Sequence, residues 1–176
     1  GFGTINWPDG TSQVYDSKDS YTKFSRTFNS LGPDAHVTIT GLTGFGESSG
    51  SDEGEAKIIG VGDTIPRTLT EFRNSFKGCT SFNPDNITKW NTRYVKSMSG
   101  MFSGATSFDR DISQWNTESL QNASFMFTGA TSFNANLTNW FTGNIKNMAS
   151  MFQGATTFNQ PIDVWDVRNV ENMDNM

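Results

Sequence analysis

The sequence has too few cysteine and histidine residues for several common kinds of site. It contains one cysteine, Cys79, and one histidine, His36. One cysteine cannot form an internal disulfide bond, and together the two residues cannot supply the four ligands of a structural zinc site. No apolar run approaches the roughly 20 residues that a membrane-spanning helix needs. We therefore expect no metal, no cofactor and no membrane insertion.

Charged residues are also scarce, at 18% of the 176 residues, and the net charge is −5. Residues 1–65 contain nine acidic and four basic side chains, whereas residues 66–176 contain nine of each. Neither part has the basic surface that nucleic-acid binding requires, so we expect no nucleic acid among the partners.

Aromatic residues, in contrast, are abundant at 13%, with 15 Phe and 5 Trp. They recur in an internal repeat whose period is 25 residues, apart from one extra residue in the first unit. The repeated columns are Trp90, Trp115, Trp140 and Trp165; Phe82, Phe108, Phe133 and Phe158; and Met101, Met126 and Met151. A unit of this size cannot bury its own apolar face, so we predict that the columns stack as a structural core ladder. Cys79 falls in a column of alanines, which predicts a small buried residue rather than a reactive thiol.

Each repeat is predicted to contain one short helix and one short strand. Val95, Met98 and Met101 have the spacing of one apolar stripe on a helix of two to three turns. Gly104 follows where a helix end favours a residue with positive φ. An extended run then leads toward the next tryptophan. The predicted fold class is therefore an α+β repeat, with residues 67–176 forming about four units, the last one incomplete.

Two polar columns accompany the aromatic ones. Asn83, Asp109, Asn134 and Asn159 follow the phenylalanines, and Asn91, Asn116 and Asp166 follow the tryptophans, where Phe141 breaks the series. The favoured interpretation is a ladder that satisfies backbone groups of the turns, and the alternative is a polar binding strip. Phe141 is either an exposed anchor for a partner or a ring folded under the next turn.

Residues 1–66 lack the period and are predicted to form a β-rich module that caps the first repeat. Strands are expected from Thr4 toward a turn at Pro8-Asp9-Gly10, over His36–Thr40 and over Lys57–Val61. His36 is interpreted as an ordinary residue at the start of a strand.

The repeated pattern of Val, Met, Met-Phe, Gly-Ala, Phe, Ile and Trp resembles the repeat of BspA-like bacterial surface proteins. That resemblance implies a leucine-rich-repeat-like, right-handed solenoid at the cell surface, with roles in adhesion or as a structural protein. It implies no catalytic residues. The N-terminal part is similar to the small β-module, reminiscent of polycystic-kidney-disease (PKD) domains, that often precedes such repeats.

Three functions follow as hypotheses. The first is a non-enzymatic adhesion protein or extracellular scaffold that binds a protein or a glycan on another surface. The second is a subunit of a filament, appendage or virion that binds copies of itself end to end, because no capping repeat follows Met176. A natural chain that runs on past Met176 explains the same ending. The predicted partner contacts are Phe141, Met173 and Met176.

The third hypothesis is a glycosidase that uses Asp109 and Asp111, since an extended segment directs residues i and i+2 to one face. Only one repeat offers this pair, so we expect no enzyme activity.

Overall fold

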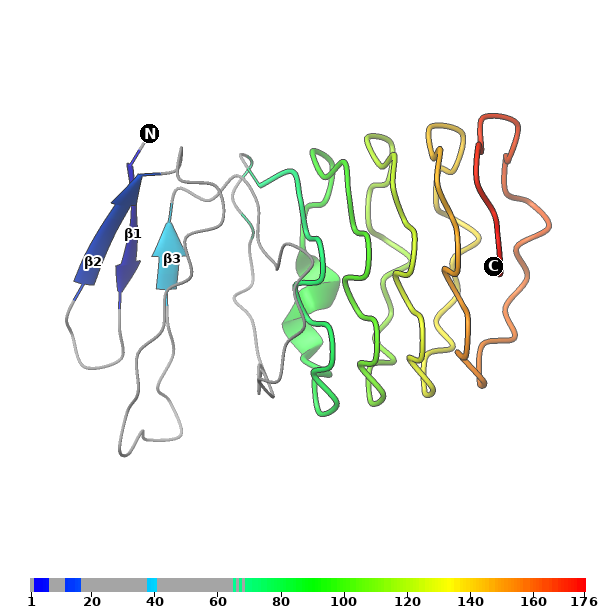
Figure 1. The fold of residues 1–176 in the computed structure, drawn as a ribbon, viewed down its shortest axis with the longest axis horizontal. Helices are drawn as coiled ribbons and strands as arrows, with labels where there is room; N and C mark the ends of the chain where they lie inside the picture. The colour runs from blue at the N-terminus through cyan, green and yellow to red at the C-terminus, as the bar shows by residue number, and fades with distance from the viewer. Residues whose placement is uncertain (1, 7–11, 17–37, 41–64, 66, 68) are drawn as a thin grey trace. The chain divides into compact units, whose positions relative to one another are not determined.

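The computed structural model describes residues 2–6, 12–16, 38–40, 65, 67 and 69–176 (Figure 1). The chain divides into two compact units, Gly1–Thr43 and Gly44–Met176. Most residues around the predicted boundary at 66–67 lie outside the described set, so that boundary stays a prediction.

The first unit contains a three-stranded antiparallel sheet in the order β2-β1-β3. Its strands are β1 (Phe2–Asn6), β2 (Ser12–Asp16) and β3 (Thr38–Thr40). The central strand β1 pairs Thr4 with Val14 on one side and with Thr40 on the other. The strands expected near Thr4 and before Gly41 are therefore confirmed, whereas β2 was not predicted.

Three other N-terminal predictions lie outside the described residues. They are the turn at Pro8-Asp9-Gly10, the residue His36 and the strand over Lys57–Val61.

The predicted strand and helix in each repeat are wrong. Residues 69–176 contain no α-helix and no strand, and their one regular element is the 3-10 helix η1 (Asp85–Lys89). Successive repeats are joined by single parallel bridges, such as that between Ser97 and Asn122. The chain therefore does not form a leucine-rich-repeat-like, right-handed solenoid of strand-plus-helix units. It forms irregular turns of about 25 residues, here called coils, which lie side by side from green to red in Figure 1.

The hydrogen bonds of the backbone explain why the helix is absent. The N–H of Met101 donates to the carbonyl of Met98 (3.1 Å), whereas the N–H of Phe102 donates to the carbonyl of Met126 in the next coil (2.9 Å). Bonds within the coil and bonds to the next coil alternate in this way along the segment. An α-helix needs each N–H for the carbonyl four residues earlier, so these groups cannot form one. The spacing of Met98 and Met101 reflects consecutive turns closed by bonds between residues i and i+3.

The predicted stacking of columns is confirmed by the aromatic rings. The rings of Phe108 and Phe133 lie 5.8 Å apart between neighbouring coils, and those of Phe102 and Phe108 lie 3.9 Å apart within one coil. All four tryptophans are buried, as are Phe82, Phe108, Phe133, Met101, Met126 and Met151. Phe158, in the last described coils, is only half-buried. The ladder thus forms a continuous aromatic core through the stack.

The tryptophans add a directional hydrogen bond to this core. The indole Nε1 of Trp115 donates to the carbonyl of Ile87, 28 residues earlier, at 3.0 Å. Trp140 and Trp165 donate to Ile112 and Leu137 in the same manner, at 3.0 and 3.1 Å. A buried indole N–H needs such a partner, so the ring is positioned by packing and by a hydrogen bond together.

The tight turn after the phenylalanine also follows the sequence prediction in part. Gly104 has φ = +71°, and a Cβ atom there would lie 3.6 Å from the backbone of Gly78 in the preceding coil. Positive φ is confirmed, although the glycine ends a turn rather than a helix. Cys79 is 2% exposed, as its place in the alanine column predicted.

Trp115→Ala should destabilise the chain by roughly 3–5 kcal/mol, because it removes a buried ring and opens a cavity between coils. Urea denaturation followed by circular dichroism measures this loss. Trp115→Phe is the matched variant, since it keeps a ring in the core and removes the bond to Ile87, and it should cost clearly less. Unchanged stability in Trp115→Ala would contradict a core role for the tryptophan column.

Candidate functional site

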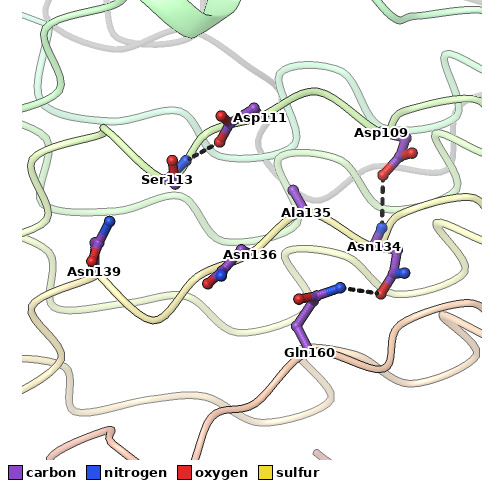
Figure 2. A pocket seen from close by; sticks show the side chains of 8 residues that line it. All are labelled: Asp109, Asp111, Ser113, Asn134, Ala135, Asn136, Asn139 and Gln160. Carbon is purple, nitrogen blue, oxygen red and sulfur yellow. Dashed lines mark hydrogen bonds between the residues drawn. The ribbon is translucent and has the colours of Figure 1, made fainter.

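An open polar pocket of about 520 Å³ lies across neighbouring coils (Figure 2). The residues that line it are Asp109, Asp111, Ser113, Asn134, Ala135, Asn136, Asn139 and Gln160. All but Ala135 carry a polar side chain. Carboxylate, amide and hydroxyl groups therefore converge here, and they suit a ligand that forms several hydrogen bonds.

Asp109 reaches this pocket as a member of the polar column that follows the phenylalanines. Its N–H donates to Oδ1 of Asn83 (3.1 Å), and its own Oδ1 accepts from the N–H of Asn134 (2.8 Å). Oδ1 of Asn134 accepts in turn from the N–H of Asn159 (2.9 Å). The predicted ladder of backbone-satisfying side chains is confirmed for this column, and it holds the pocket's coils in register.

Asp111 lines the same pocket but bonds within its own coil. Its Oδ1 accepts from the N–H of Ser113 at 2.9 Å, whereas the carboxylate of Asp109 bonds to the next coil (Figure 2). Hydrogen bonds from the side chain and then the backbone of Ser113 hold the pKa of Asp111 below its usual range. Asp111 is therefore an ionised acceptor at neutral pH.

These carboxylates are poorly arranged for glycoside hydrolysis. That reaction needs one carboxyl group to stay protonated, with a raised pKa, so that it can act as the general acid. The pKa of Asp111 is lowered instead, and Asp109 uses Oδ1 to bind Asn134. The pocket is better suited to binding by hydrogen bonds, and the expected lack of enzyme activity stays a prediction.

The second polar column closes the turns that follow the tryptophans. In each case Oδ1 accepts from the N–H two residues later: Asn91 from Arg93 (3.2 Å), Asn116 from Glu118 (3.0 Å) and Asp166 from Arg168 (3.2 Å). The structural interpretation of this column is therefore confirmed as well.

Phe141 takes the place of such a residue and is 49% exposed. Its carbonyl accepts from the hydroxyl of Thr117 (3.0 Å), so the turn is still held to the preceding coil. A Cβ atom on Gly143 would lie 3.1 Å from Cζ of the Phe141 ring, which places the ring against its own turn. This exposure favours the predicted anchor over a ring buried under the next turn.

The other two predicted contacts lie in the last coil. Met173 is 42% exposed and Met176 is half-buried. Their role in partner binding stays a prediction, as does that of Phe141.

One exposed aromatic residue was missed by the sequence analysis. Phe125 is 48% exposed and has φ = +58°, a left-handed backbone conformation. The positions equivalent to it in other coils include Asn74, Gly100 and Asn175, which also have positive φ. Asparagine and glycine are the residues that favour this conformation, so their recurrence was the available signal.

Metal and membrane predictions can be compared with the described part of the chain only. There, no group of three or more His, Cys, Asp or Glu side chains is placed to hold a metal ion. In the same residues, no helix has the length and apolar character needed to cross a membrane.

Residues 70–176 match the model of the family described as "Mycoplasma protein of unknown function, DUF285". The match covers more than half of the chain, and the chain belongs to this family. This is a Mycoplasma-type repeat family related to BspA-like surface repeats, so the predicted resemblance is confirmed at that level. No curated protein and no solved structure matches the chain.

The turn at Asp166 predicts a specific dependence on acid. Hydrogen bonds from Arg168 lower the pKa of Asp166 from 3.8 to about 2. A lowered pKa in the folded state stabilises the fold above about pH 4, and this contribution disappears as the pH falls toward 2. Asp166→Asn should therefore have a lower melting temperature than the parent chain at pH 6 and the same one near pH 2. Thermal unfolding at both pH values measures the gap, and Arg168→Gln should reproduce it. A gap that persists unchanged at pH 2 would rule out this linkage.

Proposed function

We propose that this chain is a non-enzymatic, surface-exposed repeat protein that acts in adhesion or as an extracellular scaffold. The supporting observation is the division of labour within each coil. The large apolar rings point inward and stack, whereas the outward positions carry polar groups that recur once per coil. Such a stack offers an extended surface on which contacts can be repeated or varied without changing the core.

The proposed partner is a protein or a glycan on another surface. Phe141 supports this role because it replaces a turn-closing polar residue with a ring that is 49% exposed. Exposed aromatic side chains commonly provide much of the binding energy at contacts. The polar pocket that includes Asp109 and Asn134 supplies hydrogen-bonding groups elsewhere on the surface.

The adhesion proposal is tested with beads that display the 176-residue chain. They should bind cell layers or surfaces coated with mucin or matrix protein more strongly than beads displaying an unrelated protein. Phe141→Asn restores the residue type of its column and should reduce capture while leaving thermal stability intact. Tyr94→Ser is the matched control, because Tyr94 is another exposed ring, 42% accessible, in a different coil. Failure of the parent chain to bind every surface would sink the proposal.

End-to-end assembly is a second candidate, favoured by the apolar side chains of the last coil. Val164, Val167 and Met173 are 63%, 43% and 42% exposed. A further coil in the same register, from this chain or from another copy, would cover them.

Light scattering of the 176-residue chain tests this second candidate. The mass should rise with concentration, and Met173→Asp should suppress the rise. A mass that stays that of a monomer at all concentrations would contradict assembly by this chain.

A further inference from the structure

One position of every coil has a left-handed backbone. The residues are Asn74, Gly100, Phe125, Ser150 and Asn175, with φ between 54° and 63°. Four of them are small or are of a type that tolerates this conformation, whereas an aromatic residue there is a clear outlier.

The hydrogen bonds of the stack impose this conformation on Phe125. Its N–H donates to the carbonyl of Ala149 in the next coil (2.8 Å), and its carbonyl accepts from the N–H of Thr128 (3.2 Å). Gly100 makes the equivalent pair of bonds to Ser124 and Ser103. The conformation therefore belongs to the coil, and Phe125 is strained because its side chain is unsuited to it.

Packing does not offset this strain. The Phe125 side chain is 48% exposed, whereas the neighbouring Met126 and Phe127 are fully buried. Asparagine or glycine would satisfy the same backbone without strain, as Asn74 and Gly100 do. A strained residue that gains little from burial is best explained by an interaction outside the folded chain.

The surroundings of Phe125 indicate the chemistry of its ligand. Residues 97–108, 122–133 and 147–158, the equivalent segments of three successive coils, contain no Asp, Glu, Lys, Arg or His. They offer hydroxyl and amide groups instead, including the partly accessible Ser99, Asn122 and Thr128. Such a surface has no charge to match a nucleic acid, a phosphorylated ligand or an anionic lipid.

The size of the apolar contact points the same way. A stable protein interface covers about 800 Å² on each partner around an apolar centre. Phe125 is the one large apolar side chain exposed in these three segments. A single ring is enough for a sugar, whose C–H face packs on an aromatic ring while its hydroxyl groups bond to neighbouring polar side chains.

We propose that Phe125 is the stacking platform of a binding site for a neutral carbohydrate, on the face formed by residues 97–108, 122–133 and 147–158. This inference rests on the proposed adhesive function and names the ligand class and the place of one contact.

An array of neutral hexose and N-acetylhexosamine oligosaccharides, probed with the 176-residue chain, tests the proposal. The best binder is then titrated against variants by calorimetry. Phe125→Asn should weaken binding by at least about tenfold. The same variant should raise the melting temperature by roughly 2–4 °C, because the strain is relieved.

Two further variants separate the ring from the backbone. Phe125→Trp keeps an aromatic platform and should retain binding, whereas a loss equal to that of Phe125→Asn would overturn the stacking role. Ser150→Gly changes the same position of the next coil and should leave binding unchanged. Its backbone strain is relieved without touching the ring.

Three results would overturn the inference: no binding to any neutral oligosaccharide, binding confined to sulfated or sialylated glycans, or undiminished binding by Phe125→Asn. Bead adhesion measured in parallel keeps the two proposals apart. Beads that adhere in the absence of saccharide binding would refute the carbohydrate site and retain the adhesive function. Beads that fail to adhere would refute the adhesive function itself.

Discussion

The structure of residues 69–176 depends on backbone hydrogen bonds that join equivalent residues of successive coils. The N–H of Phe102 bonds to Met126 and that of Phe127 bonds to Met151, both at 2.9 Å. Because these bonds fix which residue faces which, every side chain is placed beside its own counterpart one repeat away. The stacked rings, the glycine turns and the polar ladders are consequences of that register. A shift by a single residue would put polar groups into the core.

The sequence was sufficient to predict which residues form columns, but it was insufficient to predict the local conformation. Identity at 25-residue spacing identified the tryptophan ladder and the buried Cys79 directly. Met98 and Met101 were misassigned to a helix because a three-residue spacing is shared by helices and by consecutive turns. The two differ in the acceptor of each N–H, and here that acceptor lies 24 residues away, as for Phe102 and Met126.

The candidate sites show the same limit. Asp109 and Asp111 were expected on one face, and both line the polar pocket, but their bonds to different coils required the structure. Phe141 was visible as a break in a regular column. Phe125 was not, because its column varies among Asn, Gly, Phe and Ser, and only the shared left-handed backbone unites it. Departures from a repeat are therefore informative in backbone conformation as well as in residue type.

The indole bonds give the stack a direction in time as well as in space. Each tryptophan donates backward, as Trp140 does to Ile112, so a newly made coil has a ready acceptor on the coil made before it. Its carbonyls also complete the N–H groups that the earlier coil left open, as Met126 does for Phe102. Folding can thus advance from the N-terminal side in step with synthesis. Each coil serves as the template for the next, and no contact has to wait for a distant part of the chain.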